Sequence, residues 1–253
     1  MTEIIPIYEK KLQIPSYFVD GDAKLTVSSL FSILQEMSDN HASLLGAGWH
    51  ELRERGYFWV ITKIQLVINR LPKWTEPVLL RTWVKNSNAA TSPRDYEMLD
   101  ADGNVIIAAS SVWAILDTAN SRPQRMSMFD GSFLPQERNA IDRKPPKISA
   151  LKIPQETLNR KDVVASDIDI NRHVNNARYI QWAFDAVSED FRSTHRISGV
   201  TVNFLSQAKL GDCYATHTEQ ISDTCYETTL YSPDSQTEYC RLLSEWSPID
   251  FEL

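Results

Sequence analysis

The stretch that decides the fold lies at residues 163–187 and reads VVASDIDINRHVNNARYIQWAFDAV. Residues 163–165 are apolar and predict the end of a buried strand. From residue 177 onward, apolar side chains recur at the spacing of a helix with one buried face. Asn175 or Asn176 is predicted to cap that helix, because a short amide side chain accepts from the free N–H groups of the first turn. A polar segment therefore lies where a strand gives way to a buried helix.

Three polar side chains in this segment, Asp169, Asn171 and His173, fall within five residues. The N–H groups at the start of a helix and the positive end of its dipole favour negative charge at this position. A single Asp or Asn here is explained by an Asx turn or a cap. Three such side chains so close together favour a functional site instead.

The composite pattern Asp-x-Asn-x-His, followed by Val-Asn-Asn and a Tyr, spans residues 167–182. It resembles the signature of the acyl-acyl-carrier-protein (acyl-ACP) thioesterases, a hotdog-fold family. The resemblance implies an α+β tandem (double) hotdog, in which two long helices are each wrapped by a curved antiparallel sheet and the sheets join into one. It also implies hydrolysis of fatty acyl-ACP thioesters to free fatty acid and holo-ACP in fatty acid biosynthesis. The implied partner is the acyl carrier protein, and no cofactor is implied.

An internal duplication is predicted from the rest of the sequence. Asp20-Gly21-Asp22 precedes a predicted helix in the first half, as Asp167-Ile168-Asp169 does in the second, at an offset of 147 residues. Several predicted antiparallel strands follow in both halves, in the same order. We therefore predict an N-terminal hotdog that binds the acyl chain, a proline-rich connector and a C-terminal hotdog that carries the catalytic motif: residues 1–120, 121–155 and 156–253.

The two halves are predicted to differ in function. At an offset of 147 residues, Lys24 stands in the place of Asn171 and Thr26 in the place of His173. Packing alone does not require that difference. The sequence therefore predicts one functional site per chain, in the second half.

Thioester hydrolysis needs an activated water or nucleophile and a site that stabilises the oxyanion. We expect Asp169 to activate water or to attack directly, and Asn171 to position the carbonyl group or the water. His173 is expected to be a neutral imidazole that transfers a proton near pH 7. Backbone N–H groups of residues 174–176 are expected to supply part of the oxyanion hole.

The resemblance also reveals a departure from the family pattern. Plant members carry an adjacent Glu-Cys pair on a following strand, and alignment of that strand places Gln207 and Ala208 there. The absence of a cysteine at this position favours a water-based or Asp-based route. Gln207 and Asn175 are expected to contact substrate. Trp59 is expected to line the acyl tunnel, since the family holds the acyl chain in its N-terminal unit.

Composition limits the class of protein. The net charge of −7 argues against general nucleic-acid binding. The N-terminal MTEIIPIYEKK lacks a basic start and an apolar core, so we expect no signal peptide, and no apolar run approaches membrane-spanning length. Three cysteines without a CxxC motif suggest reduced thiols in a cytoplasm, and no metal-ligand spacing occurs. We expect a cytoplasmic monomer or homodimer without metal, membrane or nucleic acid.

An acidic carrier protein would need a basic surface near the motif. Six basic residues cluster in sequence around it, although they are equally consistent with ordinary solvated surface: Arg160, Lys161, Arg172, Arg178, Arg192 and Arg196. An acyl-CoA thioesterase of the same fold is an alternative function. A non-catalytic acyl-thioester-binding protein is another, motivated by Gln207 and Ala208. His41 is predicted to be structural.

Overall fold

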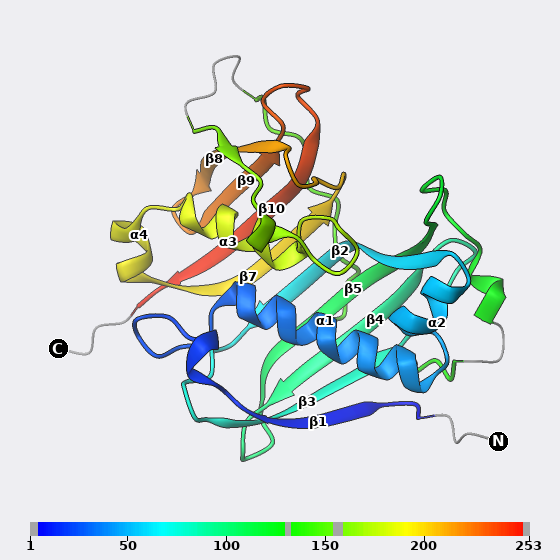
Figure 1. Ribbon diagram of the computed structural model, residues 1–253. Coiled ribbons are helices and arrows are strands. Elements are labelled where there is room, and N and C mark those ends of the chain that lie inside the picture. The colour runs from blue at the N-terminus through cyan, green and yellow to red at the C-terminus, as the bar shows by residue number, and fades with distance from the viewer. Residues whose placement is uncertain (1–4, 130–132, 154–158, 250–253) are drawn as a thin grey trace. The chain divides into compact units, whose positions relative to one another are not determined.

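The computed structural model describes residues 5–129, 133–153 and 159–249. The chain divides into two units, residues 1–145 and residues 146–253. Figure 1 shows that each unit has a helix lying across an antiparallel sheet. This is the arrangement predicted for each half of the sequence.

Unit 1 contains five strands in the spatial order β1-β3-β4-β5-β2, and all four neighbouring pairs are antiparallel. The longest helix, α1, lies across this sheet (Figure 1). The strands are β1 (Tyr8–Gln13), β2 (Tyr57–Ile68), β3 (Pro77–Val84), β4 (Ser92–Leu99) and β5 (Val105–Asp117). The helices are η1 (Ser16–Phe18), α1 (Val27–Leu44), α2 (Trp49–Glu54) and η2 (Met126–Phe129).

Unit 2 repeats this order. Its strands follow β6-β8-β9-β10-β7 in space, which is the order of unit 1 when strands are matched along the chain. The strands are β6 (Lys161–Asp162), β7 (His195–Phe204), β8 (Cys213–Ser222), β9 (Cys225–Tyr231) and β10 (Glu238–Pro248). The helices are η3 (Ala165–Asp167), α3 (Asn176–Asp185) and α4 (Glu189–Thr194). The shared topology supports the predicted duplication.

A side-chain detail of the last strands also repeats. Trp113 on β5 donates its indole N–H to Ser111 Oγ at 2.8 Å, and Trp246 on β10 donates to Ser244 Oγ at 2.9 Å. In each case the acceptor is two residues before the tryptophan, on the same face of its strand. The two final strands therefore share a local hydrogen bond as well as a position in the sheet.

The long helices form for the expected reasons. In α1 the apolar residues Leu30, Leu34 and Met37 are buried on one face, and Thr26 Oγ1 accepts from Ser29 N at 3.1 Å as the N-cap. The predicted cap of α3 is confirmed as Asn175. At 10 residues α3 is shorter than the 18-residue α1.

The predicted end of a buried strand at residues 163–165 is wrong. Strand β6 ends at Asp162, and the side chain of Val164 is 50% exposed. The Oδ2 atom of Asp167 accepts from Val164 N at 3.0 Å, and Asp167 N donates to the Val164 carbonyl at 3.0 Å. These bonds turn the chain into η3 and end the strand early.

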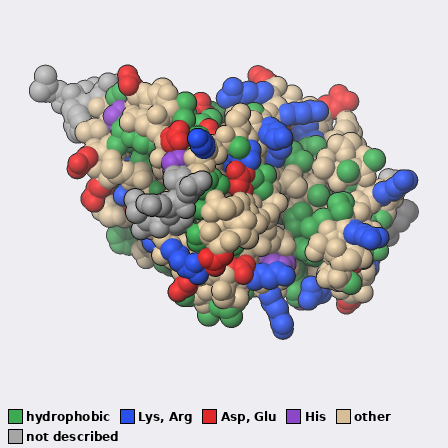
Figure 2. Space-filling model, turned by 90° about the horizontal axis from the view of Figure 1, so that it is seen from above, with side chains coloured by type: hydrophobic (Ala, Val, Ile, Leu, Met, Phe, Trp, Pro, Cys, Tyr) green, Lys and Arg blue, Asp and Glu red, His purple; other side chains and the backbone are tan. Residues whose placement is uncertain are grey.

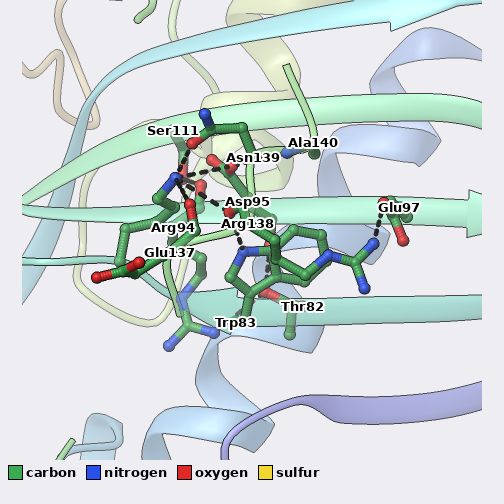
Figure 3. Close-up of polar contacts among 11 residues, drawn as sticks. Thr82, Trp83, Arg94, Asp95, Glu97, Ser111, Glu137, Arg138, Asn139 and Ala140 are labelled. Carbon is green, nitrogen blue, oxygen red and sulfur yellow. Dashed lines mark hydrogen bonds and ion pairs between the residues drawn. The ribbon is translucent and has the colours of Figure 1, made fainter. Parts of the chain in front are cut away.

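Part of the segment predicted as a connector is bound to the sheet of unit 1 (Figure 3). The indole of Trp83 donates to the carbonyl of Arg138 at 3.1 Å, and Ala140 N donates to Asp95 Oδ2 at 3.0 Å. The Arg138 guanidinium lies 4.4 Å from the centroid of the Trp83 ring and pairs with Glu97. Residues 138–140 therefore complete unit 1, while the predicted connector boundaries stay a prediction.

In unit 2 the chain is anchored in a similar way. Asn203 on β7 accepts from Ile148 N at 2.8 Å and donates to the Pro146 carbonyl at 3.0 Å, and Arg241 on β10 donates to the Ile148 carbonyl at 2.9 Å. Among the described residues, no helix is both long enough and apolar enough to cross a membrane.

Candidate active site

Residues 169–173 form one tight loop, which we call the motif loop. Asp169 N donates to the His173 carbonyl at 2.8 Å. The Oδ1 atom of Asp169 accepts from Asn171 N at 2.8 Å and from His173 N at 3.3 Å. Between them, Arg172 adopts a left-handed backbone with φ of 64°. The carboxylate of Asp169 therefore holds the loop that presents Asn171 and His173.

The start of α3 uses backbone groups that were expected to bind an oxyanion. Val174 N donates to the Ala208 carbonyl at 2.9 Å, and Asn175 N donates to the Asp167 carbonyl at 2.8 Å. The prediction of an oxyanion hole is therefore wrong for these two N–H groups, and the N–H of Asn176 is the remaining candidate of the three. Asn175 Oδ1 accepts from Ala177 N at 2.9 Å, so its side chain caps the helix, and contact with substrate stays a prediction.

Unit 1 contains the same loop at residues 20–24. Asp20 Oδ1 accepts from Asp22 N at 3.0 Å and from Lys24 N at 3.0 Å, and Asp20 N donates to the Lys24 carbonyl at 2.9 Å. Ala23 has φ of 58°, as Arg172 does in the motif loop. Asp20 is therefore the counterpart of Asp169.

The offset between the units is 149 residues (169 − 20) rather than the predicted 147. The caps of α1 and α3, which are Thr26 and Asn175, fix the same offset. The predicted pairs of Lys24 with Asn171 and of Thr26 with His173 are wrong. Lys24 corresponds to His173 instead.

The offset of 149 residues changes which residues of the motif loop are unique to unit 2. The aspartate that closes the loop is present twice, so its bonds to backbone N–H groups are part of the shared fold. Asn171 and His173 have Asp22 and Lys24 as counterparts, and these two form an exposed ion pair of 3.6 Å. The chemistry peculiar to unit 2 therefore resides in the amide and the imidazole.

The pKa of His173 is lowered, mainly because the ring is partly removed from water. The nearby Lys209 ammonium lowers it further, and the Asp169 carboxylate opposes both effects. A lowered pKa leaves the imidazole neutral at pH 7, since the ordinary value is about 6.5. A neutral imidazole is able to accept a proton, and the catalytic role of His173 stays a prediction.

The neighbouring loop, residues 205–212, is tied to α3 by a residue that sequence reasoning missed. Tyr179 Oη accepts from Ala208 N at 2.9 Å, and Ala208 is completely buried. Unit 1 lacks this bond, because Pro72 provides the matching carbonyl to Leu25 N at 2.9 Å and proline has no N–H. Leu30 takes the place of Tyr179. The tyrosine belongs to the quoted sequence pattern, but its partner lies 29 residues away.

Gln207 is exposed beside the buried Ala208. Its contact with substrate stays a prediction.

Two of the predicted basic residues are held by carboxylates. Arg178 Nε lies 3.5 Å from Oδ1 of the buried Asp167, and Arg178 also donates to the Ser166 carbonyl at 3.1 Å. Arg160 forms an ion pair with Asp234. These two guanidinium groups therefore support the local fold of unit 2.

Two predicted residues lie in unit 1, away from the motif loop in sequence. Trp59 donates its indole N–H to the Ala47 carbonyl at 2.8 Å and stacks on Phe129, with ring centroids 6.1 Å apart. Its place in an acyl tunnel stays a prediction. His41 is structural, as predicted: it is buried and bonds to the Ile5 carbonyl at 2.8 Å and to Arg94 at 2.9 Å. Burial and the Arg94 charge lower its pKa to about 4.

Similarity to solved structures defines the class of protein. An acyl-ACP thioesterase from Bacteroides thetaiotaomicron superposes with a TM-score of 0.86 at 25% identity, covering 96% of this chain and 98% of that one. A 12:0-ACP thioesterase from Umbellularia californica superposes with a TM-score of 0.81 at 21% identity, covering 96% and 98%. The predicted double hotdog fold is confirmed.

Family comparison makes the assignment specific. Residues 6–128 match the N-terminal domain of the acyl-ACP thioesterases, and residues 151–248 match their C-terminal domain. The chain belongs to the acyl-ACP thioesterase family. The acyl-[acyl-carrier-protein] hydrolase FATB3 of Cuphea viscosissima, a chloroplastic protein, is 28% identical over 215 residues, 80% of this chain. The chain spans about half the length of this relative, 52%.

Proposed function

We propose that this protein hydrolyses fatty acyl-ACP thioesters to free fatty acid and holo-ACP, within fatty acid biosynthesis. The motif loop is the observation that carries the proposal, because it presents an amide and a neutral imidazole beside a carboxylate at the start of a helix. Family membership supports the substrate class. The sparse, unpaired cysteines support a cytoplasmic setting, and we propose a monomer or a homodimer.

In this mechanism a water molecule attacks the thioester carbonyl carbon. Its proton passes to His173 Nε2 or Nδ1, or to Asp169 Oδ2, which makes no hydrogen bond to any described residue. The tetrahedral oxyanion is stabilised by the Asn171 amide and the Asn176 N–H. The C–S bond then breaks, the carbonyl re-forms, and the leaving thiolate takes that proton back from the group that accepted it, the His173 imidazolium or the Asp169 carboxylic acid.

Direct attack by Asp169 is the second route. Its Oδ2 would form an acyl-carboxyl anhydride with release of the thiol, and water would then cleave the anhydride. A single turnover in ¹⁸O-water separates the routes. Attack by water predicts label in the product fatty acid and none in Asp169. An unlabelled product with label in Asp169 after that single turnover requires direct attack, with the anhydride opened at the Asp169 carbonyl.

The experiment that tests the function is free thiol release from matched acyl-ACP and acyl-CoA substrates. We compare wild type with Asp169→Asn, which keeps an oxygen for the loop N–H groups but removes the base. The matched control is Asp20→Asn in unit 1. Turnover that prefers the carrier substrate and is lost only in Asp169→Asn supports the proposal.

Three other results would redirect the proposal. Equal or faster cleavage of acyl-CoA would indicate an acyl-CoA thioesterase. Binding of acyl-ACP with no thiol release would indicate a binding protein, for which the Gln207 and Ala208 positions provide a reason. Full activity in Asp169→Asn would leave Asp169 as a residue that only positions the loop.

A further inference from the structure

Two large apolar side chains are exposed beside the motif loop. Ile170, within the loop, is 67% exposed, and Leu210, in the neighbouring loop, is 63% exposed. The bond from Val174 N to the Ala208 carbonyl, at 2.9 Å, joins the bases of the two loops. Isolated exposed apolar residues are common, but two on adjoining loops next to a reactive imidazole indicate a contact surface.

Two cations belong to the same two loops. Arg172 is exposed inside the motif loop, and Lys209 is exposed directly before Leu210. Lys209 follows Ala208 and His173 precedes Val174, and the hydrogen bond of 2.9 Å between Val174 N and the Ala208 carbonyl brings these two positions together. Neither cation forms an ion pair with another described residue. We call Ile170, Arg172, Lys209 and Leu210 the docking patch.

The loop itself does not require this composition. In unit 1 the left-handed position of Arg172 is occupied by Ala23, with φ of 58°, and the place of Ile170 by Gly21. A left-handed backbone at a non-glycine residue is uncommon and unfavourable. The arginine therefore brings a long cation to a position where alanine already supports the same turn.

We propose that the docking patch binds an acidic carrier protein that delivers the acyl thioester. This inference rests on the proposed function and names the surface that the carrier uses. The whole protein has a net charge of −7, so an acidic partner is repelled by most of its surface and attracted where unpaired cations gather. Figure 2 shows Lys and Arg side chains gathered locally on one face among acidic groups.

The apolar and the charged residues of the docking patch have different roles in recognition. Ile170 and Leu210 provide apolar contact that loses water on docking, and Arg172 and Lys209 steer the carrier and orient it. His173 follows Arg172 directly in sequence. A carrier seated here thus presents its thioester arm within reach of the imidazole.

The test is the double variant Arg172→Glu with Lys209→Glu. We measure kcat/KM for acyl-ACP and for acyl-pantetheine with the same acyl group, at pH 8, above the ordinary pKa of an imidazole. Loss of electrostatic steering should lower the ratio of kcat/KM for acyl-ACP to kcat/KM for acyl-pantetheine about tenfold or more. The fall should shrink as salt is added, because these charges are exposed.

The control reverses two exposed arginines of unit 2 that belong to the basic set around the motif but not to the docking patch, Arg192→Glu with Arg196→Glu. They lie in α4 and at the start of β7, beyond the end of α3, which is about 15 Å long. The change in net charge is the same, and the ratio should change less than twofold. A fall in this control as large as in the docking variant would assign carrier binding to that wider set and overturn the patch.

Direct binding of holo-ACP, by titration of a fluorescent carrier, provides a readout that does not need turnover. Weaker binding in the docking variant alone supports the patch, even if the protein hydrolyses no thioester. Unchanged carrier binding and an unchanged ratio would overturn it. Equal falls in kcat/KM for acyl-ACP and for acyl-pantetheine, with unchanged carrier binding, would also overturn the proposal. They would mean that the two cations act in catalysis and not in binding of the carrier. Binding of wild type to anionic vesicles but not to ACP would assign the patch to a lipid surface.

Discussion

The loops at residues 20–24 and 169–173 share one backbone and differ in chemistry. Each is closed by an aspartate whose Oδ1 accepts from the N–H groups two and four residues later. Each has a left-handed residue at its fourth position. Unit 1 then carries an exposed Asp-Lys ion pair, where unit 2 carries an amide and an imidazole of lowered pKa. The comparison teaches that the turn belongs to the fold and that two side chains convert it into a candidate active site.

A second difference between the units lies in the contact between the helix and the loop beside the motif loop. Unit 2 connects Tyr179 to the backbone of Ala208, and unit 1 has Leu30 and Pro72 at these places. The polar pair and the apolar pair are each self-consistent, since the proline has no N–H to satisfy. Each unit therefore leaves no unsatisfied backbone N–H at this position, unit 2 by a hydrogen bond and unit 1 by a proline.

The largest effect is expected from the histidine. His173→Ala should lower kcat about 10²- to 10⁴-fold, because it removes the group that transfers the proton. Its counterpart variant, Lys24→Ala, should stay within twofold. Thiol release from acyl-ACP measures both. Comparable losses in the two variants would mean that the loops contribute to activity through folding, and circular dichroism of each variant checks for that.

The next effect concerns the bond that only unit 2 has. Tyr179→Phe leaves the buried N–H of Ala208 without an acceptor, and should lower the free energy of unfolding by about 1 to 3 kcal/mol. Denaturant titration measures the change. Tyr179→Leu combined with Ala208→Pro transplants the pair from unit 1 and should recover part of the loss. A double variant less stable than Tyr179→Leu alone would show that the two units are not interchangeable here.

The pH dependence of activity should reflect the lowered pKa of His173. The imidazole must be neutral to accept a proton, so kcat/KM should be constant at neutral pH and fall as the pH drops through a midpoint under 6.5. The fall should approach tenfold per pH unit. A midpoint above 6.5 would contradict the assignment.

Stability must be followed in the same experiment. His41 has a pKa of about 4 in the folded protein, below its unfolded value, so it contributes stability that is present above pH 6.5. That contribution is lost as the pH falls toward 4. Melting temperatures at each pH therefore separate unfolding from loss of catalysis.

The smallest effect tests the shared feature. Asp20→Ala and Asp169→Ala each remove the acceptor for two loop N–H groups that water can partly replace. Each should lower stability by about 1 kcal/mol, a fall in melting temperature of about 2 to 4 °C. Calorimetry compares them. A large effect in one unit only would mean that the two carboxylates do not have the same structural role.

Local signals predicted part of the fold correctly. The helical spacing of apolar residues from residue 177 is present as α3, with Ile180 and Ala183 buried, and Asn175 caps that helix. Both features depend on neighbouring residues whose preferences are strong.

Alignment of the two halves was less predictable. Each half offers two aspartates in an Asp-x-Asp pattern, and matching these patterns pairs Asp20 with Asp167. The hydrogen bonds pair it with Asp169, because the loop is defined by which carboxylate accepts from the backbone. The hydrogen bond of Tyr179 could not be predicted for a similar reason. Its partner is a backbone N–H, and every residue except proline has one, so the sequence does not indicate which N–H the tyrosine contacts.

The attachment of residues 138–140 to unit 1 has a consequence for synthesis of the chain. The last strand of unit 1 ends at Asp117, and Arg138 lies 21 residues later (138 − 117). A ribosome adding about 5 to 20 residues per second needs about 1 to 4 seconds to cover that distance. During this interval the nascent sheet exposes the surface around Trp83, which is completely buried in the finished protein. The newborn unit therefore passes through a brief stage in which a chaperone, or another nascent chain, can reach an aromatic surface that later disappears.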